Sequence, residues 1–440
     1  MESLRSRFFA YWDTPFFVEL LLLALTAPVL YFPDRFPVFF ILAAIALLAA
    51  GWLWRRRTIG VWFRRTPADW PLFFLFLVML PVSVWAAPGP LREQYAIPKA
   101  CILTWNISLF WTVVVHGSRR LELRNLCGAG FVLAGGAIAL LAIFGTAWPN
   151  KIFGLSNILA RIPHLLGGVF ERASGGFNSN VVAGSLLYVL PFALALTITA
   201  LFRKERSYPV LLPLFFVTGV IGLVFVAVQS RGGLIGLTIG LLAMLLVNWR
   251  WGRWLLLGGG LVVIIGLAAT PIDFLASAVE AAQDAQTVVG SLTLSGRIEI
   301  WSRALYGIQD FSFTGMGLGT FSRIAPILYP LFLIPPDYDF GHAHNIFLQT
   351  ALDFGIPGLI AFLAIYVSGI GVVIRLWRTP LPLEKRGWVL GMSGVLIAHT
   401  IYSMADTIAM GANNNFFFWW LFALIMAMQS DVDHQKESLY

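Results

Sequence analysis

Long runs of apolar residues recur along the chain, and they limit its possible folds more than any other feature. A helix needs about 20 apolar residues to cross a bilayer, and the backbone must satisfy its own hydrogen bonds there. About twelve such runs are present: 15–33, 36–54, 71–87, 98–116, 126–147, 179–202, 209–229, 233–248, 254–270, 353–374, 388–406 and 413–430. The sequence therefore predicts an all-α fold, a polytopic membrane helix bundle of about 12 transmembrane helices.

The composition supports a membrane location. Hydrophobic residues make up 58% of the chain and charged residues only 12%, whereas a soluble domain is roughly 25% charged. The first run follows Arg5 and Arg7 and has no small-residue cleavage site, so we expect a retained first helix. Cys101 and Cys127 fall in different runs, which predicts two free thiols. Few charges interrupt the predicted spans.

The basic residues orient the predicted bundle. With the N-terminus inside, 20 of the 30 Lys and Arg residues fall in segments on the cytoplasmic side. Short cytoplasmic loops are enriched in Lys and Arg, so we expect both termini in the cytoplasm. The net charge of +8 follows from these loops, and we expect no nucleic-acid partner.

The spans and loops divide the chain into five parts. Residues 1–147 hold transmembrane helices 1–5, and 148–178 form an external amphipathic segment typical of a helix in the interface plane. Residues 179–270 hold helices 6–9, 271–352 form a large external loop, and 353–440 hold helices 10–12 and a cytoplasmic tail. A loop of about 80 residues far exceeds a simple connection, so functional residues are expected in it.

Two arginines on the predicted outer side, one between two spans and one in the large loop, are candidate anion-binding residues. Arg231 is followed by two glycines that would let backbone N–H groups approach a phosphate; a snorkelling arginine in a turn is the alternative. Arg297 follows Ser295 and Gly296 at a predicted helix start, where a cation opposes the helix dipole. An anion bound there would explain that placement.

His344 is the strongest candidate for acid–base chemistry. It lies in Gly341-His342-Ala343-His344-Asn345, where a loop enters an apolar helix, and a neutral histidine with a pKa of about 6.5 suits general-base catalysis. Asp337 and Asp339 lie just upstream and allow a metal site as an alternative. Two histidines without a clustered carboxylate are a poor ligand set, so we predict no metal.

These motifs carry a resemblance to a known family. His344-Asn345, nine residues and then Gly355-Ile356-Pro357-Gly358 is similar to the H-[NSQ]-x9-G-x-x-G signature of bacterial O-antigen ligases. The wider O-antigen ligase/polymerase superfamily has further motifs in the order Arg172-x-x-Gly175-x-Phe177-Asn178-x-Asn180, Ser230-Arg231-Gly232, Ser295-Gly296-Arg297 and Gly315-x-Gly317-x-Gly319-Thr320-Phe321. The chain differs at Ser179, where the superfamily often has proline.

The resemblance implies a GT-C-type glycosyltransferase of the inner membrane that is inverting, metal-independent and free of cofactors. Its donor would be O-antigen on undecaprenyl diphosphate, and its acceptor the lipid A–core oligosaccharide at the periplasmic face, with membrane lipids around it. His344 would be the catalytic base. Arg231 and Arg297, with Arg172 as a weaker third cation, would bind the diphosphate, and Asn345, Asn178 and Asn180 would support the site.

Other functions remain compatible with the sequence. An O-antigen polymerase and a protein O-oligosaccharyltransferase share the motifs and differ in the acceptor. A transporter of lipid-linked glycans would place ionisable residues near the bilayer midplane. The predicted polar cluster lies outside the spans instead.

Overall fold

The computed structural model describes residues 13–146, 148, 177–203, 208–248, 251, 254, 258, 294–335 and 338–431. Every regular element in these ranges is a helix, and Thr146 and Phe177 form one isolated β-bridge. The predicted all-α fold is confirmed. Cys101 and Cys127 are both buried free thiols.

Seven helical stretches are long and apolar enough to cross a membrane. They are α2 (Thr14–Tyr31), α3 (Val38–Ile59), the stretch Asp69–Ala86, the stretch Gly89–Arg119, α8 (Leu121–Gly145), α12 (Tyr208–Ala227) and α18 (Ile346–Arg378). Asp69–Ala86 combines α4 (Asp69–Phe74), η2 (Leu75–Met79) and α5 (Leu80–Ala86), and Gly89–Arg119 combines α6 (Gly89–Leu91), η3 (Arg92–Ala96) and α7 (Ile97–Arg119). The helices α10 (Ser179–Leu187) and α11 (Leu190–Leu201) are together long and apolar enough for an eighth crossing if this pair, bent by 41°, is one span. The chain is a polytopic helical membrane protein.

Three further helices occupy predicted spans but are shorter or less apolar: α13 (Arg231–Asn248), α19 (Leu383–Ser403) and α20 (Phe416–Ala427). The helix α19 packs between α11 and α13, so part of its surface never meets lipid. The predicted span 254–270 and the amphipathic segment 148–178 lie almost entirely outside the described residues. The count of twelve therefore stays a prediction.

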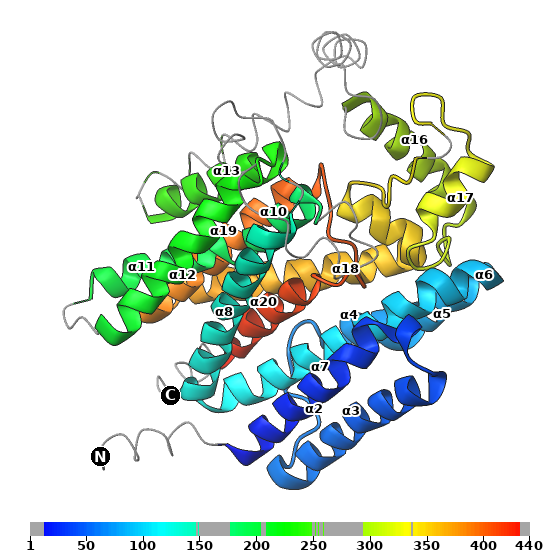
Figure 1. The fold of residues 1–440 in the computed structure, drawn as a ribbon. Coiled ribbons are helices and arrows are strands. Elements are labelled where there is room, and N and C mark those ends of the chain that lie inside the picture. The colour runs from blue at the N-terminus through cyan, green and yellow to red at the C-terminus, as the bar shows by residue number, and fades with distance from the viewer. Residues whose placement is uncertain are drawn as a thin grey trace.

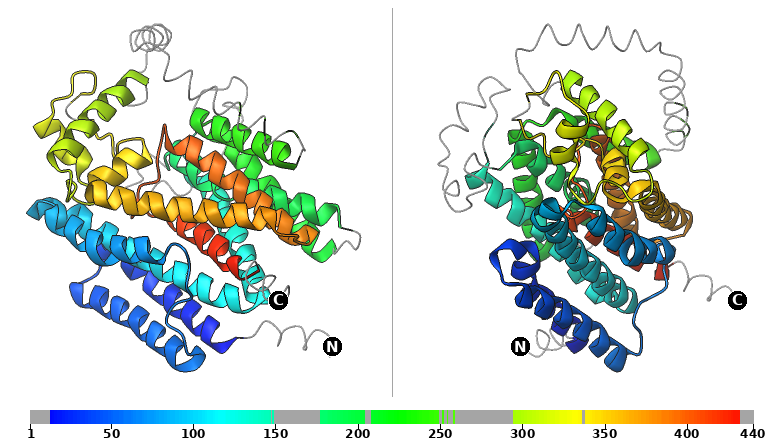
Figure 2. Two further views of the ribbon diagram at one scale, coloured as in Figure 1. Left: turned by 180° about the vertical axis from the view of Figure 1, so that it is seen from behind. Right: turned by 90° about the vertical axis from the view of Figure 1, so that its right-hand side faces the viewer.

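The helices pack around α7, whose side chains are mostly buried. The helices α2 and α20 pack against α7, and α18 packs against α4, α19 and α20. Figures 1 and 2 show that α16 (Leu294–Asp310) and α17 (Phe321–Leu328) lie together at one end of the bundle. The predicted loop 271–352 therefore contains two helices. It also ends earlier than predicted, because α18 begins at Ile346 rather than near residue 353.

A break at Gly355 divides α18 into a short outer segment and a long spanning segment. Gly355 has φ 69° and ψ 179°, and a Cβ atom there would lie 2.5 Å from the Phe313 carbonyl oxygen. The freed Ile356 N–H donates to the Ser312 carbonyl oxygen at 2.7 Å. Only glycine suits this close approach and backbone conformation, which explains its place in the motif.

The opposite end of the bundle gathers segments that the sequence assigns to the cytoplasm. Asp431 pairs with Arg124 at 2.9 Å and with Lys385 at 2.8 Å, and Arg203 pairs with Glu384. These ion pairs join the start of α8, the end of α11 and the start of α19 to the end of the described chain. Arg124, Arg203 and Lys385, which belong to predicted basic segments, thus lie at one end of the bundle.

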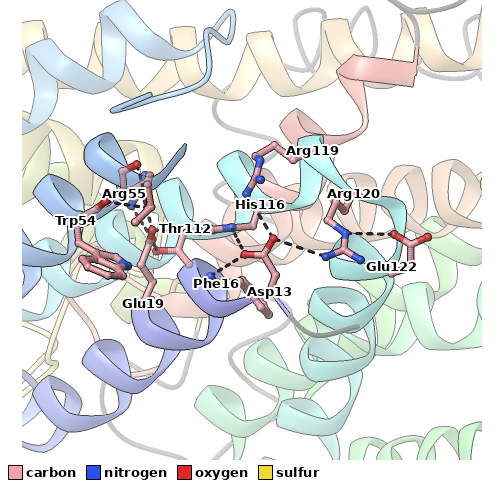
Figure 3. Close-up of polar contacts among 11 residues, drawn as sticks. Asp13, Phe16, Glu19, Trp54, Arg55, Thr112, His116, Arg119, Arg120 and Glu122 are labelled. Atoms are coloured by element: carbon pink, nitrogen blue, oxygen red, sulfur yellow. Dashed lines mark hydrogen bonds and ion pairs between the residues drawn. The ribbon is translucent and has the colours of Figure 1, made fainter. Parts of the chain in front are cut away.

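Charges inside the spans of that half form one closely paired group, here called the inner cluster (Figure 3). The Arg55 Nε and Nη2 atoms each donate to a Glu19 carboxylate oxygen at 2.8 Å, and Thr112 donates to Glu19 Oε2 at 2.8 Å. The His116 Nε2 atom lies 3.1 Å from Glu19 Oε1. All four side chains are buried. The spans therefore hold more charge than the sequence led us to expect, but these charges neutralise one another.

Candidate functional site

The outer cluster consists of His342, His344, Asp406 and Arg297, which come from three separate segments. The two histidines lie in the loop before α18, Arg297 in the first turn of α16, and Asp406 in the turn after α19. His344 and Arg297 were predicted site residues. The structure brings them together through Asp406, which contacts both.

The start of α18 holds His344 in place. Asn345 is the N-cap residue, and its Oδ1 atom accepts from the Phe347 and Leu348 N–H groups at 2.9 and 3.1 Å. Its Nδ2 atom donates to the Met404 carbonyl oxygen at 3.2 Å. Asn345 therefore joins the His344 loop to the Asp406 turn.

His344 has a left-handed backbone conformation, with φ 50°. For a residue other than glycine, this conformation costs on the order of 1–3 kcal/mol and is concentrated at functional sites. The His344 N–H donates to His342 Nδ1 at 3.1 Å, and the Asn345 cap follows directly. These hydrogen bonds offset the strain and fix the direction of the imidazole.

The imidazole of His344 presents a free nitrogen. Its Nδ1 atom lies 3.3 Å from Asp406 Oδ1, and because a carboxylate only accepts hydrogen bonds, Nδ1 carries the proton. In the neutral imidazole, Nε2 then has a lone pair. It is buried and has no hydrogen-bond partner among the described residues. A substrate hydroxyl that reached this atom would find an unoccupied base.

Asp406 is held as a carboxylate. Burial raises its pKa, but the hydrogen bond from His344 and the nearby Arg297 charge hold that pKa below its usual value. The Thr407 N–H also donates to Oδ1 at 2.9 Å. Our sequence analysis missed Asp406 because it ends the predicted span 388–406 without a motif. A lone carboxylate at the end of an apolar run was the available signal.

Arg297 is only partly neutralised. Its Nη2 atom lies 3.7 Å from Asp406 Oδ2, which is too long for a good hydrogen bond. Its Nε atom is buried with no partner among the described residues. A guanidinium with unused donors beside the free His344 nitrogen favours the binding of an anion at this point.

His342 is a neutral neighbour. Burial, the adjacent His344, and the positive charges of Lys99 and Arg297 lower its pKa to about 3, against the opposing effect of Asp406. The neutral ring accepts from the His344 N–H, and the two ring centroids lie 4.4 Å apart. Its contacts thus position the backbone of His344.

The outer cluster also offers one possible set of metal ligands. One atom each from His342, His344 and Asp406 lie within 4.8 Å of one another. Arg297 already places a positive charge beside Asp406, and this opposes a second cation. Asp406 thus supplies the clustered carboxylate that the sequence did not show. In the alternative Asp-x-Asp pair, Asp339 pairs with Arg323 at 2.6 Å instead, and Asp337 lies outside the described residues.

Arg231 stands at the first position of α13, with an exposed side chain. It has no ion-pair partner in the part of the chain that the structure describes, and it is not in contact with the outer cluster. The next residue, Gly232, faces Tyr402, whose ring lies 3.7 Å from a Cβ built there. Tyr402 precedes Asp406 by one helical turn, so the start of α13 borders the Asp406 turn.

The predicted asparagines shape the start of α10. Asn178 caps the helix by accepting from the Asn180 N–H at 2.8 Å, and Tyr402 donates to the Asn180 carbonyl oxygen at 2.7 Å. Ser179 takes the first helical position, where proline also fits. The departure from the superfamily motif therefore leaves the turn intact. Arg172 lies outside the described residues.

Lys99 is a further cation near the outer cluster that the sequence analysis missed. Its ammonium group lies against Gly319, where an added Cβ atom would overlap it. Gly319 has φ 72° and donates its N–H to Asp353 Oδ1 at 2.8 Å. The last glycine of the Gly315–Gly319 motif thus makes room for Lys99. Lys99 was not predicted as a site residue because it lies within the predicted span 98–116.

Comparison with known families agrees with these motifs. Residues 214–363 match the family model described as O-antigen ligase, a stretch that includes Arg231, Arg297 and His344. No curated protein matches the chain. The resemblance to the O-antigen ligase superfamily is confirmed over this stretch.

Proposed function

We propose that the chain, whose residues 214–363 match the O-antigen ligase family model, transfers O-antigen polysaccharide from undecaprenyl diphosphate to the terminal sugar of the lipid A–core oligosaccharide. The observation that carries this proposal is the outer cluster. There, a histidine with a free buried nitrogen lies beside an incompletely paired arginine. The first can accept a proton and the second can bind a phosphate.

The proposed reaction is a single displacement that inverts the anomeric carbon. The acceptor hydroxyl oxygen bonds to that carbon while the bond between carbon and the diphosphate oxygen breaks. The hydroxyl proton passes to His344 Nε2, and the bonding electrons leave with undecaprenyl diphosphate. Asp406 keeps Nδ1 protonated and stabilises the imidazolium that forms.

The cations serve the leaving group. Arg297 and Arg231, with Arg172 as a weaker contributor, bind the diphosphate and stabilise its growing charge. Asn345, Asn178 and Asn180 support the site by fixing the starts of α18 and α10. With arginines in this role, the reaction requires neither metal nor cofactor.

The setting we propose is a GT-C-type fold of about twelve spans in the inner membrane, with cytoplasmic termini and a periplasmic site. The ion pairs of Asp431 with Arg124 and Lys385 support this orientation, because they gather basic segments at the end opposite the outer cluster. Donor and acceptor are both anchored in lipid. A site at the membrane edge lets both reach it.

The test combines purified protein, undecaprenyl-diphosphate-linked glycan and rough lipopolysaccharide in EDTA, without nucleotide. The expected product is a ladder on lipopolysaccharide, which His344→Ala almost abolishes. Glycan that grows on undecaprenyl diphosphate would identify a polymerase instead, and glycan on protein an O-oligosaccharyltransferase. Activity that appears only after Mg²⁺ or Mn²⁺ is added would contradict the metal-free reaction.

A further inference from the structure

The helix α17 and the segments on either side of it, residues 311–335, expose five large apolar side chains outside the spanning helices. This apolar rim consists of Phe313, Ile327, Leu328, Phe332 and Leu333. Phe313 and Ile327 are each 79% exposed and Phe332 is 83% exposed. An apolar surface of this kind on a folded protein marks a place where lipid or a partner covers it.

The helix α18 gives the depth of one side of the rim. From Gly355 to Arg375 it rises about 30 Å, which matches the thickness of the hydrocarbon core. Ile360 and Val367 are exposed on this segment. The Ile356 N–H donates to the Ser312 carbonyl oxygen at 2.7 Å. Phe313 therefore lies at the hydrocarbon boundary, in line with the lipid-facing residues of α18.

The stretch Asp69–Ala86 gives a second, independent anchor. Ser83 donates to the Asp353 carbonyl oxygen at 2.5 Å, which places the end of α5 at the same level. Trp85 is exposed there, as is typical of an aromatic residue at a membrane interface. The loop before α17 contacts this end, because a Cβ built at Gly317 would lie 2.7 Å from Ala87.

The helix α17 is tied to the segment that leads into α7. The Arg323 Nε atom donates to the Tyr95 hydroxyl at 2.8 Å, and Tyr95 lies in η3, just outside α7. The residues that follow α17 are hydrogen-bonded to α16. The Glu299 carboxylate accepts from the Phe332 and Leu333 N–H groups at 2.6 and 2.9 Å.

We propose that the apolar rim rests in the interfacial layer of the membrane leaflet nearest the outer cluster. Its occupant is lipid, because Phe313 follows Ser312, which contacts the outer end of the lipid-facing segment of α18, and the loop before α17 contacts the outer end of α5. The helix α16 carries both Glu299 and Arg297, so this anchor would also set the height of Arg297 above the bilayer. The proposal rests on the membrane spans and does not depend on the proposed reaction.

The test is site-directed spin labelling of the full chain in lipid nanodiscs. Single cysteines replace Phe313, Ile327 or Phe332 in a Cys101→Ala, Cys127→Ala background. Ile360→Cys is the lipid-facing control, and Gln94→Cys, an exposed polar residue beside Tyr95, is the matched control at the same end. Because the rim residues are exposed, their substitution should leave the fold intact.

The expected result is that labels on the rim collide more with oxygen than with a water-soluble nickel complex, as at Ile360, while the label at Gln94 shows the reverse. Rim labels that behave like Gln94 would overturn the proposal. So would rim labels shielded from both reagents, since that pattern would indicate a protein partner or a second copy of the chain. A loss of transfer activity would not bear on this result.

Discussion

The outer and inner clusters use the same side-chain types in opposite ways. Each combines a histidine, an arginine and a carboxylate. In the inner cluster, Arg55 and Glu19 form two hydrogen bonds of 2.8 Å between fully buried side chains. In the outer cluster, Arg297 lies 3.7 Å from Asp406, and His344 lies 3.3 Å from it.

The difference lies in what remains available for a substrate. Glu19 and Arg55 use their hydrogen-bonding capacity on each other, on Thr112, on His116 and on the Trp62 carbonyl oxygen. In the inner cluster His116 Nδ1 also has no hydrogen-bond partner and lies 3.8 Å from Asp13 Oδ1. The outer cluster leaves both a histidine nitrogen, His344 Nε2, and an arginine donor, Arg297 Nε, without partners among the described residues. A closely paired set joins α2, α3 and α7, whereas an incompletely paired set at the membrane edge is suited to bind and react.

The largest expected effect is on the rate of transfer. General-base assistance is worth about 10²–10⁴-fold, or roughly 3–5 kcal/mol of barrier, so His344→Ala should lose that factor while donor affinity stays nearly unchanged. Arg297→Ala should lower both the transfer rate and the donor affinity, because a diphosphate contact acts before and during bond breaking. Single-turnover experiments measure the transfer rate, and donor titrations measure the affinity. Equal loss of donor affinity in both variants would move His344 to the diphosphate site.

The inner cluster should respond through stability. Arg55→Met leaves Glu19 as a buried, unpaired charge, which costs about 3–5 kcal/mol, so thermal unfolding in detergent should shift strongly downward. The double variant Glu19→Gln, Arg55→Met removes both charges and should recover much of that loss. An Arg55→Met protein as stable as the wild type would show that the pair does not hold these helices together.

A smaller effect on rate is expected at Asp406. Asp406→Asn keeps the shape but loses the charge that holds the proton on His344 Nδ1, so the rate should fall by at least about tenfold, or 1.4 kcal/mol. The pH–rate profile should shift with it, which a purely structural loss would not cause. Asp339→Asn is the control, because Asp339 pairs with Arg323 instead. Equal losses in the two variants would remove Asp406 from its positioning role.

The smallest effect concerns acid stability. His342 has a pKa of about 3 in the folded protein and about 6.5 when unfolded, so the unfolded chain binds more protons between these values. Stability should therefore fall as the pH drops from 6.5 toward 3. His342→Gln should reduce that slope in detergent melts at pH 7, 6 and 5. An unchanged slope would mean that His342 is protonated in the folded protein.

The sequence predicted those parts of the fold that depend on local patterns. Apolar runs located the spanning helices, and the motif spacing located His344 before α18 and Arg297 in the first turn of α16. Both are properties of neighbouring residues. The first turns of α18, residues 346–352, were assigned to the large loop because the predicted span begins at 353, although His344 was placed where a loop enters an apolar helix. The break at Gly355 depends on a contact with Phe313.

The rest of the site depends on long-range packing. Asp406 lies 62 residues from His344 in sequence, and Lys99 lies in an early span, so neither belongs to a local motif. The inner cluster likewise joins residues from α2, α3 and α7 that are far apart in the sequence. Sequence spacing alone does not show which charge in one span meets which in another.

Two histidines test the contrast between the clusters most directly. His344→Ala and His116→Ala are prepared side by side, and the single-turnover transfer rate and the melting temperature of each are measured. We predict that His344→Ala loses about 10²–10⁴-fold in rate with little change in melting temperature, and that His116→Ala melts earlier but transfers at nearly the wild-type rate. A His344→Ala protein that turns over normally, or a His116→Ala protein that is stable but inactive, would contradict this assignment.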